Sequence, residues 1–206
     1  MGYMRYRPSQ NKPLMCSGAV NQYWMGLNEM LLYIWEEYKK PSGEELWKGL
    51  EIGAYMGEST QMFLSSGLFR GGFTVIDSWT LGQHGEQTND RFWVDIKNQF
   101  EHNVRIFEDE SWWSGENLKV IRGWSQNSHV EIKDDSLDFI YIDGDHSYEA
   151  VKRDLELYLP KLKKGGLMCG HDYDKEAWLG CCEAIDEVIG KPEKVFMDSS
   201  WIKQIY

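Results

Sequence analysis

Residues Leu137–Tyr148 read LDFIYIDGDHSY, and the expected architecture can be built outward from them. The segment begins as a mostly apolar run and passes directly into Asp143, Asp145 and His146. A short apolar run of this kind is consistent with a buried strand of a parallel sheet. In open α/β sheets, ligands bind in the crevice beyond the carboxyl ends of the strands. We therefore expect Asp143 and His146 to lie in a binding crevice.

Strand and helix patterns alternate on both sides of this segment. The expected strands are Trp47–Ile52, Phe73–Ile76, Leu118–Ile121, Phe139–Ile142 and Leu167–Gly170. The expected helices are Tyr23–Lys40, Ser59–Phe69, Phe92–Phe100, Tyr148–Leu162 and Trp178–Ile189. Two further apolar runs, Val195–Met197 and Trp201–Ile205, predict a terminal hairpin. The pattern predicts an α/β fold: a mostly parallel sheet with an antiparallel C-terminal hairpin and helices on both faces.

Length and composition limit the kinds of protein that this chain can be. A chain of 206 residues fits one domain, and we expect residues 1–43 to form an arm and helix and residues 44–206 the core. The net charge of −11, without a block of Lys and Arg, disfavours nucleic acid as a partner. No apolar run reaches membrane-spanning length. The spacing of the four cysteines matches no zinc signature, so we expect reduced thiols in a cytoplasmic protein.

A glycine-bearing turn, EIGAYMGEST at residues 51–60, follows the first expected strand. Glycine at such a turn lets the backbone approach a ligand closely. The turn has neither the G-x-G-x-x-G spacing of dinucleotide binders nor the lysine of a P-loop. Its acidic residue, Glu51, suits an amine-bearing ligand, and Ser59 and Thr60 would lie near a helix N-terminus that attracts a carboxylate. Taken alone, such a turn is as often a structural turn as a binding site.

Two more segments end strands with polar residues. Asp77 follows the second strand at the position from which an acid can bind the hydroxyls of a ribose. In isolation it is equally well read as a helix cap or a solvated loop acid. Arg122-Gly-Trp-Ser125 follows the third strand, where an adenine could rest.

Together the segments EIGAYMGEST, VIDSW, IRGWS and DFIYIDGDHSYEAVKRDLELYLPKLKKGGLMCGHDY resemble a known family. They resemble class I methyltransferases that use S-adenosylmethionine (AdoMet), in particular the macrocin O-methyltransferase-like group, methyltransferase family 24. The resemblance runs from about Glu44 to the terminal hairpin. It implies a Rossmann-like, doubly wound sheet of seven strands with a reversed last strand.

The resemblance also implies roles for the matching residues. The turn at residues 51–60 would hold the methionine part of AdoMet, Asp77 the ribose, and the segment at residues 123–125 would border the adenine. The full cofactor-binding set is Glu51, Gly53, Tyr55, Gly57, Ser59, Thr60, Asp77, Gly123, Trp124, Ser125 and Asp143.

The expected chemistry lies after the fourth and fifth strands. The resemblance implies a divalent metal, magnesium or manganese, held by Asp143, His171 and Asp172, with Asp143 and His146 as catalytic residues and His146 as the base. The family usually has a carboxylate or amide where this chain has His171, and magnesium prefers oxygen ligands, whereas manganese tolerates an imidazole. Three alternatives remain: His171 only orients the ligands, it is an ordinary buried histidine, or no metal binds. His146 is alternatively a polar residue at a helix N-terminus.

The expected function is O-methylation of a hydroxyl on a small polar molecule such as a sugar, by a protein that can be a homo-oligomer. One alternative is methylation of a nucleobase or a protein side chain. Enzymes that methylate amino groups of nucleic acids usually carry Asn/Asp-Pro-Pro-aromatic where this chain has Asp143-Gly-Asp-His. A second alternative is a non-catalytic AdoMet-binding module. We expect acceptor contacts from loops 78–91 and 107–117, with His84, Trp112 and Trp113, and from the N-terminal arm.

Overall fold

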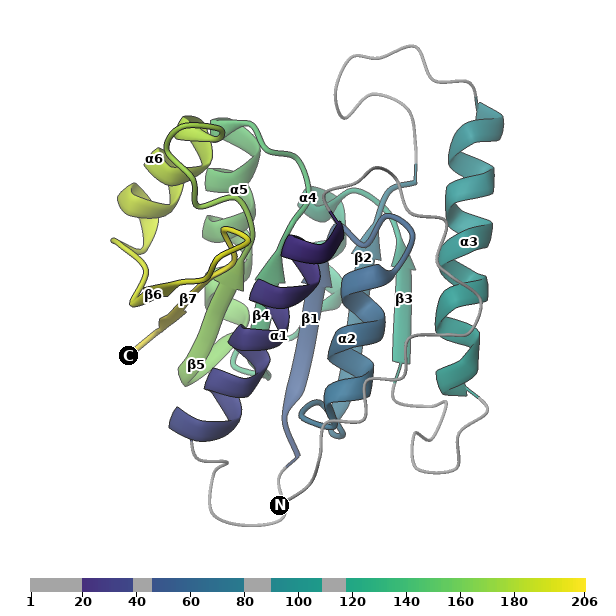
Figure 1. The fold of residues 1–206 in the computed structure, drawn as a ribbon, viewed down its shortest axis with the longest axis horizontal. Helices are drawn as coiled ribbons and strands as arrows, with labels where there is room; N and C mark the ends of the chain where they lie inside the picture. Colours follow the sequence, from purple (N-terminus) through teal and green to yellow (C-terminus); the bar gives the residue numbers. More distant parts are fainter. Residues whose placement is uncertain (1–19, 39–45, 80–89, 109–117) are drawn as a thin grey trace.

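A computed structural model describes residues 20–38, 46–79, 90–108 and 118–206 (Figure 1). The N-terminal arm up to residue 19 and the three loop residues expected to contact the acceptor, His84, Trp112 and Trp113, lie outside the described residues.

The described strands form one seven-stranded sheet in the order β3-β2-β1-β4-β5-β7-β6. The strands are β1 (Lys48–Ile52), β2 (Gly72–Asp77), β3 (Leu118–Arg122), β4 (Leu137–Ile142), β5 (Leu162–Gly170), β6 (Lys194–Val195) and β7 (Trp201–Gln204). Neighbours among β1 to β5 pair in parallel, whereas β7 pairs antiparallel with β5 and with β6. The predicted mostly parallel sheet with a reversed C-terminal hairpin is confirmed.

Helices cover both faces of the sheet, as predicted (Figure 1). They are α1 (Val20–Glu37), α2 (Glu58–Ser66), α3 (Asp90–Glu108), α4 (Ser125–Ser128), α5 (Tyr148–Tyr158) and α6 (Leu179–Val188). Side chains of α1, α2 and α3 share one apolar cluster with one face of the sheet, and those of α5 and α6 share a second with the other face. None of the helices in the described segments is long and apolar enough to cross a membrane.

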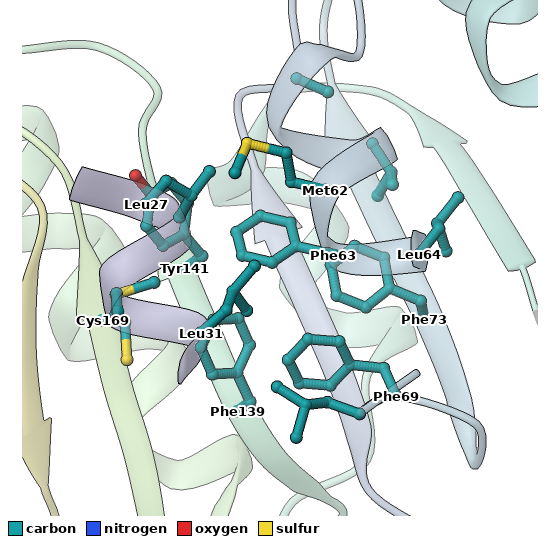
Figure 2. Close-up of a cluster of buried hydrophobic side chains, with 14 of the residues drawn as sticks. Leu27, Leu31, Met62, Phe63, Leu64, Phe69, Phe73, Phe139, Tyr141 and Cys169 are labelled. Carbon is teal, nitrogen blue, oxygen red and sulfur yellow. The ribbon is translucent and has the colours of Figure 1, made fainter. Parts of the chain in front are cut away.

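Strand β4 joins the two clusters because its six residues are all buried and alternate between the faces. Phe139 and Tyr141 face α1 and α2, whereas Ile140 and Ile142 face α5 and α6. Figure 2 shows Phe63 of α2 among the rings of the first cluster, and its ring lies 5.0 Å from that of Tyr141. A buried polar residue in such a strand needs a partner, and Asp138 near the start of β4 has two: the backbone N–H of Lys48 donates to its carboxylate, and Lys163 pairs with it, each at 2.8 Å.

The largest boundary error is at α3, which ends at Glu108 and not at the predicted Phe100, so Phe107 and Glu108 are helical and do not belong to a loop. Another boundary error lies after β4. The predicted helix Tyr148–Leu162 ends at Tyr158, because Pro160 lies in a 3₁₀ turn over Leu159–Lys161 and cannot continue the α-helical hydrogen bonds. Strand β5 therefore begins at Leu162, five residues before the predicted start, and its pairing with β4 is irregular near Leu137.

The helix α1 faces the sheet with only part of its apolar residues. Leu27, Leu31 and Ile34 are buried, but Trp35 is 43% exposed. Adjacent helical residues point about 100° apart, so Ile34 and Trp35 cannot both face the sheet. The predicted end of α2 at Phe69 is also too late: Gly67 ends the helix in the left-handed conformation, with φ at 71°.

The strand order places a switch point between β1 and β4. The chain builds outward from β1 to β2 and β3 and then returns to β4 on the other side of β1. Ligands of doubly wound sheets bind at the carboxyl edge of such a point.

The cysteines at positions 169, 181 and 182 are buried and form no disulfide.

Candidate active site

The turn between β1 and α2 is held by its own polar side chains. The hydroxyls of Ser59 and Thr60 donate hydrogen bonds to the two carboxylate oxygens of Glu51, and all three residues are buried. Burial raises the pKa of Glu51 to about 8, although the two hydroxyls favour its charged form. These three predicted cofactor residues therefore contact one another. Tyr55 and Gly57 complete the turn, both with positive φ.

Asp77 fastens this turn to β2. One of its carboxylate oxygens accepts the backbone N–H groups of Ala54 and Tyr55, and the other accepts that of Trp79, each at 2.8 Å. Burial raises the pKa of Asp77, whereas these three N–H groups oppose the rise. The residue predicted to bind ribose is thus also a structural support of the turn.

A cleft of about 180 Å³ opens at the carboxyl edge between β1, β2, β3 and the start of α5. It brings together several predicted cofactor residues: Gly53, Asp77, Gly123, Trp124 and Ser125. The hydroxyl of Ser125 donates to Asp154 on α5 at 2.6 Å, so α5 and the segment after β3 form one wall. Burial raises the pKa of Asp154 to about 6.

Three polar groups of this cleft lack a hydrogen-bond partner within the described part of the chain, although one of them, Arg153 Nε, lies 3.8 Å from Asp154 Oδ1 in an ion pair. The Ser78 hydroxyl, the Gln126 Oε1 atom and the Arg153 Nε atom are buried without a hydrogen bond. A buried polar atom without a partner costs about 1–3 kcal/mol, so such atoms require an explanation. Sequence reasoning missed all three. Ser78 and Gln126 directly follow predicted residues, but no sequence signal places Arg153 of α5 in the cleft.

A second group of polar residues lies at the ends of β4 and β5. Asp143, His146 and Asp172 each offer a ligand atom, and these atoms lie within 4.8 Å of one another. Asp172 is buried and its carboxylate pairs with His146 Nδ1. Two carboxylates and an imidazole are donors that manganese and similar divalent metals accept. We call Asp143, His146 and Asp172 the edge cluster.

His171, predicted as a metal ligand, lies beside the edge cluster. Its Nδ1 lies 2.8 Å from the other oxygen of Asp172, so the carboxylate stands between two imidazoles, and it is His146 that joins the two aspartates. Burial alone would lower the pKa of His171, but Asp172 raises it to about 9. Burial alone would likewise raise the pKa of Asp172, yet the hydrogen bonds from His146 and His171 hold it well below its usual range. Asp172 is fixed in this place by a left-handed backbone, with φ at 64°.

The cleft and the edge cluster adjoin at Gly53. Gly53 has φ at 84°, and a Cβ there would overlap the carbonyl oxygen of Asp143. The backbone N–H of Asp143 donates to Ile52 at 2.8 Å, and Gly144, the next residue, lines the cleft. A ligand in the cleft would therefore extend toward the edge cluster.

The arrangement combines a binding cleft with a proton acceptor. With Asp172 accepting the Nδ1 proton of His146, the Nε2 atom of a neutral His146 is the basic nitrogen. An imidazole oriented by a carboxylate in this way is a competent general base.

A family model described as a methyltransferase domain matches residues 50–173, more than half of the chain. The uncharacterised protein R132 of Acanthamoeba polyphaga mimivirus is 31% identical over 68 residues, and this match covers 31% of each protein.

Solved structures share the fold at low sequence identity. The O-methyltransferase NovP gives a TM-score of 0.62 at 17% identity, over 87% of this chain and 77% of NovP. CalS11, a TDP-rhamnose 3'-O-methyltransferase of calicheamicin biosynthesis, gives 0.53 at 15% identity, over 86% and 77%. An O-methyltransferase of Bacillus cereus in complex with SAH gives 0.52 at 15% identity, over 94% and 93%.

Proposed function

The chain belongs to the methyltransferase domain family, and on this premise we propose that it transfers a methyl group from AdoMet to a hydroxyl of a small polar molecule. The observation that carries the proposal is the junction at Gly53 between a cleft with unpartnered polar atoms and the edge cluster. The cleft suits a polar cosubstrate, and the edge cluster suits removal of a proton from a hydroxyl.

The cleft fits AdoMet by the chemistry of its lining. Adenosine offers hydrogen-bond donors and acceptors, and Ser78, Gln126 and Arg153 present both kinds of group without hydrogen-bond partners in the described chain. Asp77 would serve the ribose, and the turn at residues 51–60 the methionine part, as the resemblance implies.

The edge cluster fits a divalent metal by its donor set. Asp143 and Asp172 would supply the carboxylates, and we assign the role of His171 to orienting Asp172. Carboxylate oxygens alone suit magnesium and manganese alike, and an imidazole ligand would favour manganese. When bound, AdoMet supplies an electrophilic methyl group, and a divalent metal lowers the pKa of a hydroxyl held beside it.

The residues of the chain would remove the proton from the hydroxyl and hold the two reactants together. His146 would accept the hydroxyl proton at Nε2, while Asp172 holds Nδ1 and stabilises the resulting imidazolium. The cleft and the edge cluster hold both reactants close together, which supplies much of the rate enhancement in bimolecular transfers. CalS11 is named for methylating a sugar, TDP-rhamnose. A sugar hydroxyl is accordingly the acceptor that we propose.

The proposal is tested by methyl transfer from labelled AdoMet to a panel of sugars, measured with chelator and after manganese or magnesium is restored. The D172N variant should lose about 100-fold or more in rate, because it removes the charge that orients His146. The matched control is D135N, at an exposed aspartate that also has positive φ, and it should be unaffected. A chelator-resistant rate would refute the metal.

The H146A variant tests whether His146 acts as a base or as a metal ligand. If His146 is the base, H146A should abolish methyl transfer, whereas its affinity for manganese, measured by calorimetry, should stay within about twofold of the wild type. A tenfold loss of affinity, about 1.4 kcal/mol, would make His146 a ligand instead.

A further inference from the structure

Trp178 lies directly before α6 and against the edge cluster. Its ring stacks on that of His146, with 4.7 Å between the ring centroids and 30° between the planes. Yet the side chain remains 40% exposed, and its neighbour Leu179 is 54% exposed. An apolar surface thus adjoins the edge cluster.

The start of α6 holds Trp178 firmly in this place. The Cys181 thiol donates to the backbone carbonyl of His146 at 3.1 Å. Gly180 packs on α5, since a Cβ there would lie 3.4 Å from Tyr148. The backbone N–H of Trp178 donates to Asp174 at 2.7 Å. These contacts hold the backbone around Trp178, and the ring stacking places its indole beside His146.

A second exposed tryptophan gives the contrast. Trp35 is exposed to a similar degree, 43%, but its indole N–H donates to Ser66 at the end of α2, at the opposite edge of the sheet. An exposed aromatic ring offers a flat apolar face and a polar edge, which suits it to bind ring-shaped ligands. Only Trp178 of this pair presents that face next to the candidate base.

We propose that Trp178 and Leu179 form the apolar wall of the acceptor subsite. This inference rests on the proposed function and narrows its acceptor to a hydroxyl carried by a ring with a flat apolar face. Such a ring would lie along the exposed indole while its hydroxyl points toward His146. The carboxylates of Asp143 and Asp172 disfavour a reacting ring that is itself negatively charged. Two kinds of ring offer a flat apolar face together with a hydroxyl: a pyranose, through its C–H face, and an aromatic ring.

The test measures ring binding by saturation-transfer NMR in the presence of S-adenosylhomocysteine. The probes are methyl α-L-rhamnopyranoside and catechol, with glycerol as a hydroxyl compound that has no ring. We expect the wild type to bind at least one ring probe and not glycerol. The W178A variant should bind that ring about three- to tenfold more weakly, whereas W178F should retain most of the affinity. The matched control W35A should bind like the wild type.

Calorimetry with AdoMet on every variant separates this inference from the function on which it rests. If the wild type and W178A bind AdoMet equally and also bind the ring equally, the apolar wall is refuted and the proposed function stands. If the wild type binds AdoMet but neither ring, the acceptor class is refuted. If the wild type binds no AdoMet, the proposed function fails and the inference fails with it. Should W178A not fold, L179S tests the same wall at a residue with no role in holding His146.

Discussion

The turn between β1 and α2 and the wall of the neighbouring cleft are both rich in buried polar groups, but they use them differently. In the turn, Glu51 and Asp77 accept hydrogen bonds from hydroxyls and backbone N–H groups of the chain itself. In the wall, Ser78, Gln126 and Arg153 hold buried polar atoms without such partners in the described residues. Under the proposed function, the polar groups of the turn shape the site and those of the wall would bind the ligand. Substitutions in the turn should affect stability, and those in the wall should affect binding.

The largest effect is expected at Gly53. A G53A substitution places a Cβ into the Asp143 carbonyl and forces an L-residue to φ of 84°. We expect it to lower the free energy of unfolding by about 4 kcal/mol or more, since strain and overlap add. The control is G67A, where φ is 71° but no atom lies within 4 Å of the added Cβ. It should lose only about 1–2 kcal/mol. Equal losses in urea unfolding would show that the junction at Gly53 is not closely packed.

Glu51 should make stability depend on pH. Its pKa is raised from 4.5 to about 8 in the folded chain, so folding favours the protonated form. Its contribution is fully present below pH 4.5 and is lost as the pH rises through about 8, by about 1 kcal/mol or less per pH unit.

The variant E51Q should lack this dependence, because an amide does not titrate. Urea unfolding of both proteins at several pH values checks the prediction. A wild type that gains stability over E51Q between pH 5 and pH 8 would show that the folded site favours the carboxylate.

Substitution of Asp77 should have the next largest effect on stability. The D77N variant replaces one of two accepting oxygens by an amide donor that faces backbone N–H groups. We expect a loss of about 2 kcal/mol in the free energy of unfolding. If D77N keeps full stability and loses only AdoMet affinity, then the ribose role outweighs the structural one.

Ser78 should show the opposite behaviour with the smallest effect. Removing an unpartnered buried hydroxyl leaves no partner stranded, so S78A should unfold within about 0.5 kcal/mol of the wild type. Its affinity for AdoMet, measured by calorimetry, should fall by about fivefold, equivalent to one lost hydrogen bond. If S78A is destabilised but binds AdoMet normally, then Ser78 has a structural role like that of the polar residues in the turn.

The fold could be predicted from the sequence because its signals are local. Apolar runs ending at acids or glycines marked β1, β2, β4 and β5, and the parallel sheet followed from their alternation with helices. Boundaries were less certain, since Pro160 and Gly67 end helices through local conformation that apolar periodicity does not report.

The site could be predicted only where its residues follow strand ends. Gly53, Asp77 and the segment at residues 123–125 indeed line one cleft. Apolar patterns do not report that His146 lies beside both aspartates while His171 contacts the other oxygen of Asp172. Arg153 and Trp178 reach the site through the packing of α5 and α6, and helical periodicity gives only which side of a helix is apolar.

Calorimetric titration of the purified protein with AdoMet tests the central claim most directly, with NAD as the comparison ligand. We predict one AdoMet site per chain and no NAD binding. AdoMet should still bind when manganese is present, and manganese should restore methyl transfer after a chelator has abolished it. Absence of AdoMet binding at concentrations of about 1 mM, where even an affinity of −4 kcal/mol is detected, would contradict the central claim.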